Sequence, residues 1–346
     1  MAQLTSKRYQ VNDLPEAMEL YFEKGWTDGL PVVPPTEEKI VAMLDAAGLD
    51  PDREIAQIKD RRVTVTAEKV AINAVMAGCR PEYMPVVAAA VEAIGDPRWG
   101  YHGPGTSTGG AAVFMLVNGP IARELDINSG DNLFGPGWRA NASIGRAVRL
   151  VMRNVIGTLP GKLDRSTLGH PGKYTYVIAE NEVDSPWPPV HVERGFRPEQ
   201  SVVTVLAAEA PHQFYNQLSN TAGGILTTVC DDMRISGNVM GQPTYVLVLA
   251  GEHTRTIARD GWSKGDIRKF VFEHTQNSVA HLKRTQRMPG SVTHDDETTM
   301  RPLVASPEDI VVVAAGGRAG AFSAYIPGWG SRRWTECVSK EIKGRR

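Results

Sequence analysis

In Val246–Trp262, VLVLAGEHTRTIARDGW, an apolar segment ends at a glycine turn and a helical segment with an early arginine follows. Val113–Ile127, VFMLVNGPIARELDI, has the same order. Short, continuous apolar segments bounded by glycine are typical of buried strands. The two stretches predict strand, turn and helix units. They also indicate a weak internal duplication, although α/β proteins produce this pattern by chance as well.

Further segments extend this reading along the chain. Apolar strands are predicted at Ala111–Val117, Tyr174–Ile178, Val202–Ala207, Tyr245–Ala250 and Ile310–Ala314. Helices are predicted at Leu14–Lys24, after the N-cap candidate Thr36, at Thr64–Ala77 and at Met84–Ile94. Strands that alternate with helices favour an α/β fold with mostly parallel sheets.

A proline-rich segment, SPWPPVHVERGFRPEQ at residues 185–200, breaks regular structure and marks a boundary. We therefore expect two lobes, an N-terminal α/β lobe at residues 1–190 that carries a glycine-rich anion loop, and a C-terminal α/β lobe at residues 191–346. Ligands of open α/β sheets bind beyond the carboxyl ends of the strands. The predicted site is thus a cleft between the lobes.

Length and charge limit the classes of function. The chain has 346 residues, of which 42% are hydrophobic, and a formal net charge of −1. Chains longer than roughly 250 to 300 residues usually hold two domains or one enlarged unit. A net charge near zero gives no general attraction for nucleic acid or for an anionic membrane. No apolar run reaches the roughly 20 residues of a membrane span, and the N-terminal stretch lacks the apolar core of a signal peptide, so we expect a cytoplasmic protein.

The strongest functional signal is the stretch Asn128–Asn154, where a glycine-rich loop leads into an arginine-rich helix. Glycines let backbone N–H groups turn toward a ligand, and a helix start attracts anions. The residues predicted to bind an anionic substrate here are Gly135, Gly137, Arg139, Asn141, Ser143 and Arg146, with Asn141 and Ser143 as N-cap candidates. The alternative is a solvated helix with an ordinary capped start.

A second glycine and arginine turn follows the strand at Ile310–Ala314. It reads GGRAGAFSAYIPGWG at Gly316–Gly330, where Arg318 would favour an anion and Ser323 could donate a hydrogen bond. Two such turns after two strands make an anionic ligand more plausible than either turn alone. A glycine turn is also an ordinary way to leave a strand.

Candidate catalytic groups come from three places. His253, with Glu252 beside it, follows a strand and is the leading general acid or base, since an imidazole titrates near pH 6.5. The alternative is a surface helix cap. His102 begins a glycine-rich loop in which Ser107 and Thr108 could line an oxyanion pocket, or simply a polar loop. Cys79 lies beside Arg80 at a predicted helix end, where a structural role competes with a nucleophilic one.

The three cysteines, Cys79, Cys230 and Cys337, are far apart, and no CxxC motif is present, so we expect reduced thiols. No motif requires a cofactor. A divalent metal is the remaining option, and its candidate ligands are His170, His191 and Glu193, without a supporting signature such as HExxH.

Several stretches together resemble a known family. They are GWTDGLPVVPPTEEK, VTAEKVAINAVMAGCRPEYMPVV, NSGDNLFGPGWRANASIGRAVRL, LGHPGKYTYVIAENE with HVERGF, and GWSKGDIRKFVFEH. Over most of its length the chain looks like a family of uncharacterised bacterial proteins. That family is similar in part to the UGSC group, named for a selenocysteine- or cysteine-containing Gly-Ser motif and often given a thiol-disulfide isomerase label. The chain lacks CGSC and CxxC motifs, so the resemblance implies a bacterial catabolic or accessory enzyme without the reacting atoms of a dithiol.

The sequence as a whole predicts an enzyme that acts on a small anionic, carboxylated metabolite by acid/base-assisted bond cleavage, as a lyase, hydratase or hydrolase. Two alternatives stay open, namely a thiol-dependent oxidoreductase and a non-catalytic accessory subunit of a partner enzyme. We expect no nucleic-acid or membrane partner. A homo-oligomer is expected, because apolar helices such as Met84–Ile94 would serve an interface as well as a core.

Overall fold

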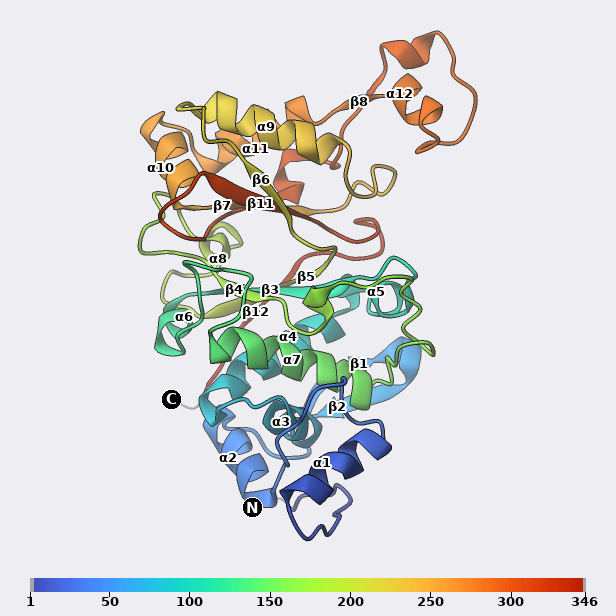
Figure 1. Cartoon of the computed structure of the whole chain (residues 1–346), viewed down its shortest axis with the longest axis vertical. Helices are drawn as coiled ribbons and strands as arrows, with labels where there is room; N and C mark the ends of the chain where they lie inside the picture. The colour runs from blue at the N-terminus through green and yellow to red at the C-terminus, as the bar shows by residue number, and fades with distance from the viewer. Residues whose placement is uncertain (1–2, 345–346) are drawn as a thin grey trace.

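The protein has a mixed α/β fold built around two four-stranded sheets, seen one above the other in a computed structural model that describes residues 3–344 (Figure 1). The strands are β1 (Glu54–Ile58), β2 (Val63–Thr66), β3 (Ala112–Asn118), β4 (Val177–Ala179), β5 (Val202–Ala208), β6 (His212–Tyr215), β7 (Tyr245–Leu249), β8 (Asn277–Ser278), β9 (Met300–Arg301), β10 (Ile310–Ala314), β11 (Phe322–Pro327) and β12 (Val338–Glu341). The helices are α1 (Leu14–Glu23), α2 (Glu37–Ala47), α3 (Ala67–Met76), α4 (Met84–Gly95), α5 (His102–Thr106), α6 (Pro120–Glu124), α7 (Arg139–Asn154), α8 (Val190–Glu193), α9 (Ala222–Arg234), α10 (Gly251–Arg259), α11 (Lys264–His274) and α12 (Val279–Arg284).

The two large sheets have the orders β4-β3-β5-β12 and β10-β7-β11-β6. In each sheet one pair is parallel, β3 with β4 and β7 with β10, and the other two pairs are antiparallel. The prediction of mostly parallel sheets is therefore not confirmed. It missed β6, β11 and β12, which form three of the antiparallel pairs, and the predicted strands β3 and β5 form the fourth.

Alternating side chains divide the core into three layers. Along β3, Met115 and Val117 pack toward helices α3, α4 and α7, whereas Phe114 and Leu116 pack toward the second sheet. Along β7, the side chains alternate in the same way between the other sheet and the helices α9, α10 and α11. Because both faces of these strands are covered, their sequences are continuously apolar. These three core layers lie between four layers of secondary structure, in the order helices, sheet, sheet and helices.

An apolar layer fills the space between the two sheets, so a cleft between two lobes is not confirmed. Phe114, Leu116 and Ile178 from one sheet meet Val246 and Val313 from the other, and all five are at most 2% exposed. One sheet also contains strands from both sides of the predicted boundary at residues 190 and 191, because β5 and β12 lie in the same sheet as β3.

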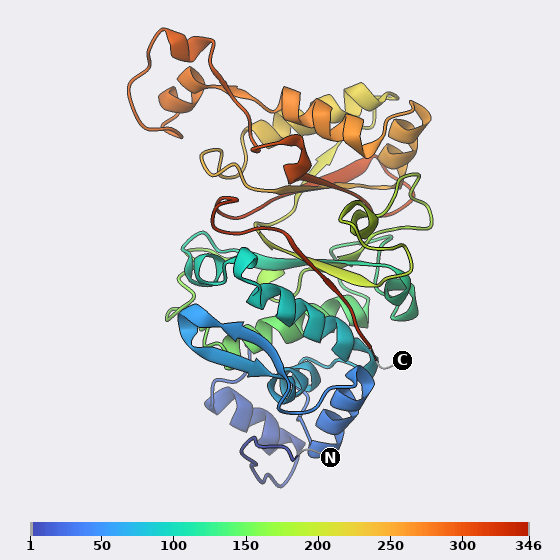
Figure 2. The same cartoon turned by 180° about the vertical axis from the view of Figure 1, so that it is seen from behind.

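Two smaller sheets lie outside these layers. β1 and β2 form a hairpin beside α4, and β8 with β9 forms the base of an arm that carries α12 away from the body (Figure 2). No helix among residues 3–344 is both long enough and apolar enough to cross a membrane.

Most predicted elements are present, with shifted ends. Helix α3 begins at Ala67, because the residues before it form β2, and α7 begins at Arg139, before both of its N-cap candidates. The prediction of Asn141 and Ser143 as caps is therefore wrong. Trp138 occupies the N-cap position and makes no side-chain capping bond.

Candidate functional site

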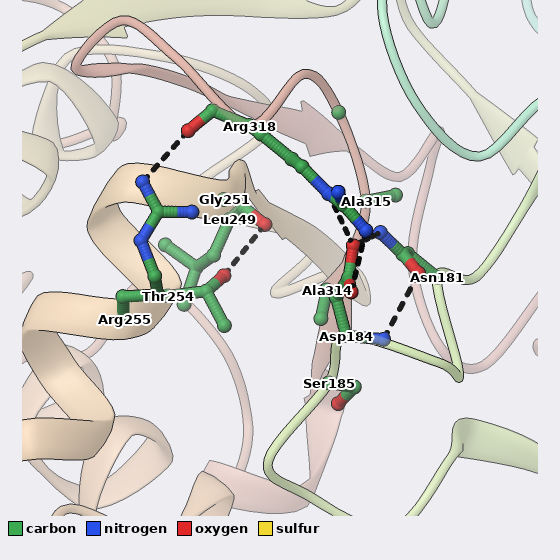
Figure 3. A pocket seen from close by; sticks show the side chains of 11 residues that line it. Asn181, Asp184, Ser185, Leu249, Gly251, Thr254, Arg255, Ala314, Ala315 and Arg318 are labelled. Carbon is green, nitrogen blue, oxygen red and sulfur yellow. Dashed lines mark hydrogen bonds and ion pairs between the residues drawn. The ribbon is translucent and has the colours of Figure 1, made fainter.

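A cavity of about 350 Å³ opens where the parallel strands β7 and β10 end, and we call it the strand-end cavity (Figure 3). It is lined by Asn181, Asp184, Ser185, Leu249, Gly251, Thr254, Arg255, Ala314, Ala315, Gly316 and Arg318. Ligands of α/β sheets bind at this place, and cavities for small molecules start at about 300 Å³. The strand-end cavity is therefore the candidate binding site.

The loop after β4, the turn after β10 and the start of α10 form this cavity, and backbone hydrogen bonds hold them in place. The loop after β4 is tied to β10, because the Asn181 N–H donates to the Ala314 carbonyl oxygen over 2.8 Å. The loop before α7 is tied to the turn after β10 by the bond from Gly316 N to Ser129 O. Segments that are far apart in the sequence thus converge on one site.

Glycine is required where the turn after β10 approaches the start of α10. A Cβ atom at Gly251 would lie 2.9 Å from the Arg318 Cα atom, and Gly316 has a φ angle of +112°. Side chains at either position would displace the turn or strain it. These glycines bring the Arg318 backbone against helix α10.

Two arginines and one aspartate supply the charges of the cavity. Arg318 pairs with Asp184 through two bonds of 2.9 Å, and the Arg318 side chain is 76% exposed. Arg255 donates to the Arg318 carbonyl oxygen over 2.7 Å. Within residues 3–344, no carboxylate forms an ion pair with Arg255. Figure 3 shows both guanidinium groups with the Asp184 carboxylate held by Arg318.

The first turn of α10 adds the positive end of a helix dipole. The Gly251 N–H is used by the Gly317 carbonyl oxygen, and the N-cap residue Ala250 makes no side-chain capping bond. In the described part of the chain, the N–H groups of Glu252 and His253 find no acceptor, as expected for the orphan donors of a helix start. The positive end of the helix dipole thus adds to the positive charge of the two arginines.

The Asp184 carboxylate is a weak base while it stays paired. Hydrogen bonds from Arg318 and Asn181 hold its pKa below the ordinary value, and the Arg318 pKa is raised by the same contact. A ligand anion that took the Arg318 guanidinium would remove this stabilisation. The Asp184 pKa would then return toward that of a free carboxylate.

The arginines of α7 do not form an anion site. Arg146 binds Asp28 through two bonds of 2.8 Å and also donates to the Pro31 carbonyl oxygen. Arg139 donates to the Gly78 carbonyl oxygen, and Arg149 pairs with Asp164. The prediction that Arg139 and Arg146 hold a ligand is corrected by these internal partners, which occupy their guanidinium groups.

The polar residues of the same stretch are structural too. Asn141 is 8% exposed, accepts from Asn128 N and donates to the Val177 carbonyl oxygen, so it ties the loop to β4. The Ser143 hydroxyl donates to the Arg139 carbonyl oxygen. Gly135 and Gly137 shape the turn before α7 and do not line the strand-end cavity.

His253 is buried in the first turn of α10 and does not line the cavity. It is 1% exposed; its Nδ1 atom is 2.7 Å from the Ser323 hydroxyl, and its Nε2 atom donates to the Asn216 carbonyl oxygen over 3.3 Å. Burial lowers the His253 pKa, which the Asn216 bond and Glu252 oppose only in part. Ser323 also accepts from Ala250 N. Glu252 is exposed, and none of these three side chains lines the cavity.

The predicted oxyanion loop lies elsewhere. His102 is exposed with its Nδ1 atom 2.9 Å from an Arg61 nitrogen, and Thr108 is exposed. The Ser107 hydroxyl oxygen accepts from the Trp329 indole and from Gly109 N. These residues are absent from the cavity lining.

The cysteines are unsuited to thiolate chemistry. Cys79 is 7% exposed, and burial raises its pKa to about 12, although a Ser143 hydrogen bond and nearby arginines oppose this rise. Cys230 is buried with a pKa raised to about 12, and Cys337 is also free. A nucleophilic role for Cys79 has no support in this environment.

The predicted metal ligands do not converge. His170 lies beside Ala208 and Tyr176, His191 lies beside Glu182, and Glu193 binds Lys264 and Arg268. Residues 3–344 contain no group of three or more His, Cys, Asp or Glu side chains that could hold a metal ion.

Of the predicted site residues, only Arg318 lines the strand-end cavity. The sequence reading missed Arg255, Asp184 and Asn181. The sequence contained a signal for Arg255, because this residue is the early arginine of the Val246–Trp262 stretch. Asp184 and Asn181 come from a loop after a three-residue strand, and no sequence pattern places that loop beside β10.

Comparisons with known proteins add no assignment. Neither the protein-family models nor the curated proteins include a match for this chain.

Proposed function

We propose that the protein binds a small carboxylated metabolite in the strand-end cavity. The observation that carries this proposal is the convergence of Arg255, Arg318 and the uncapped start of α10 on one cavity. Forked guanidinium donors suit a carboxylate, and helix N–H donors add to the same charge preference. The bidentate contact of Asp184 with Arg318 is the kind of bond that a ligand carboxylate would make.

Asp184 is the proposed general base of an acid/base-assisted cleavage, which would make the protein a lyase, hydratase or hydrolase. A ligand carboxylate that binds Arg318 displaces Asp184, and the freed carboxylate becomes more basic beside the bound ligand. His253 and Glu252 are replaced in this role because neither lines the cavity. The thiol-dependent alternative is not proposed, since burial raises the Cys79 pKa to about 12.

The test is a thermal-shift screen of the protein against small carboxylates, phosphates and divalent ions. A ligand that binds only the folded state raises the melting temperature. We expect carboxylates to raise it, and the shift to disappear in Arg255→Ala and Arg318→Ala.

Arg123→Ala is the matched control. Arg123 lies four residues after Gly119, as Arg255 lies four residues after Gly251, and it is exposed but outside the cavity lining. This variant should keep the full carboxylate shift. If no carboxylate stabilises the wild-type protein, or if Arg123→Ala loses the shift as Arg255→Ala does, the proposed site is wrong.

A further inference from the structure

The two large sheets match each other pair by pair. Residues 115–117 of β3 pair with 177–179 of β4, and residues 247–249 of β7 pair with 312–314 of β10, both in parallel. The next neighbours, β5 and β11, are antiparallel to β3 and β7. The two strands meet each other at Ala208 and Gly328, where Glu209 N bonds to Pro327 O and Trp329 N to Ala207 O. Exchange of the two halves of the chain converts one of these bonds into the other.

The outermost strands also match, but each of them pairs with the sheet of the other half of the chain. β6 follows β5 in the chain but pairs with β11, whereas β12 follows β11 but pairs with β5. Each half of the chain therefore adds its last strand to the sheet of the other half. The strand registers therefore assign to each residue of one half a corresponding residue of the other half.

The matched positions at the strand ends differ in chemistry. Gly119 before α6 corresponds to Gly251 at the start of α10. Glu180 corresponds to Ala315 and Glu182 to Gly317, by the registers of β4 and β10. Carboxylates at the ends of β3 and β4 thus replace the small residues that leave room for the strand-end cavity at β7 and β10.

A lysine fills the space beside these carboxylates. The Lys264 ammonium donates to Glu180 over 3.0 Å and to Glu193 over 3.2 Å, and the lysine side chain is 3% exposed. Glu180 also accepts from Val190 N and from the Asn118 amide, each over 2.7 Å. Lysine is rarely buried in this way unless its charge is paired.

Two polar atoms beside the Glu180 and Glu182 carboxylates have no hydrogen-bond partner within residues 3–344. They are Asn118 Oδ1 and His191 Nδ1, and both residues are fully buried. His191 Nδ1 lies 3.9 Å from the Glu182 carboxylate, which is too far for a hydrogen bond. The buried polar cluster at the ends of β3 and β4 thus has more hydrogen-bonding capacity than the described residues use, unlike an ordinary core.

We propose that the chain contains two copies of one unit, and that the ends of β3 and β4 form a second binding site which the chain itself occupies with the Lys264 ammonium group. This site would prefer a primary ammonium ion, since the groups that contact the Lys264 ammonium are the Glu180 and Glu193 carboxylates. The second site prefers cations, whereas the strand-end cavity prefers anions. The inference does not depend on the function proposed for the strand-end cavity.

Truncation of the lysine tests the site. Lys264→Ala removes three carbons and the ammonium group, which together correspond to n-propylammonium. We expect this variant to melt at a lower temperature than the wild type, because Glu180 is left buried without its cation. Added n-propylammonium chloride should restore at least half of the lost melting temperature in a saturable manner, beyond the effect of sodium or tetramethylammonium chloride.

Two controls separate binding from general salt effects. Lys264→Met fills the space with an uncharged chain of similar length, and Leu282→Ala opens a buried space without carboxylates. Neither variant should respond to n-propylammonium. Equal rescue of all three variants, or no rescue of Lys264→Ala, would overturn the proposal.

The wild-type protein provides a test that does not depend on a variant folding. Reductive methylation followed by peptide mass spectrometry compares the reaction of each lysine amine in the folded chain. Lys264 should remain unmodified while exposed lysines such as Lys162 react, and denaturation should abolish the difference. Modification of Lys264 at the rate of the exposed lysines in the folded protein would contradict its placement as the occupant of the site.

Discussion

At the scale of single residues, burial separates side chains with structural roles from those that can meet a ligand. His253 and Cys79 are reactive residue types that the sequence offered as catalytic candidates, and both are buried. Arg255 and Arg318 reach the strand-end cavity. Residue type predicted the charge of the ligand, but it could not predict exposure, because exposure depends on the second sheet and its loops.

His253 should make the protein less stable in acid. Its folded-state pKa is lowered, chiefly by burial, so below about pH 6.5 the unfolded chain binds a proton that the folded chain does not. Stability is therefore full above that pH and falls as the pH drops toward the folded pKa. His253→Gln should flatten the dependence of melting temperature on pH in this range, with His102→Gln as the exposed control. His170, whose pKa burial also lowers, should retain part of the slope. An unchanged slope in His253→Gln would contradict this account.

Cys79 should react slowly with iodoacetamide. A thiol whose pKa is raised to about 12 by burial holds almost no thiolate at neutral pH, and the thiolate is the reacting form. Peptide mass spectrometry of the folded protein should find Cys79 unmodified under conditions that alkylate it after denaturation. Rapid alkylation of Cys79 in the folded state would instead restore the thiol-dependent alternative.

At the scale of elements, the arginine-rich helix α7 fastens the N-terminal segment to the sheet. Its amphipathic pattern and apolar spacing predicted the helix, and they could not show that Arg146 binds Asp28 from a loop more than a hundred residues earlier. Burial opposes ionisation of Asp28, but the hydrogen bonds and charge of Arg146 hold its pKa below the ordinary value.

Arg146→Ala should therefore destabilise the fold. The two side chains are 15% and 9% exposed, and removal of one partner from such a pair leaves a charge in a nearly dry site, at a cost of about 3 kcal/mol. Urea unfolding measures this cost. Arg139→Ala, on the exposed part of the same helix and bonded only to a carbonyl oxygen, should cost clearly less. Equal midpoints for the two variants would show that the Asp28 pair is unimportant.

At the scale of the whole molecule, the sequence predicted the α/β class and the long apolar strands, because strands covered on both faces are apolar at every position. It could not predict the sheet order. β11 lies within the glycine-rich Gly316–Gly330 stretch, and β6 is an edge strand with mostly exposed side chains. The Asp184 loop follows β4 in one sheet and contacts β10 of the other sheet, so it reaches the cavity only because the two sheets stack. The sequence therefore predicted only part of the candidate site.

The central claim is that Asp184 occupies the place of a ligand carboxylate on Arg318. Isothermal titration calorimetry of one stabilising carboxylate against the wild-type protein and Asp184→Asn tests it most directly. Removal of an internal competitor should make the carboxylate bind measurably more tightly to Asp184→Asn than to the wild-type protein. Unchanged or weaker binding in Asp184→Asn would contradict the claim.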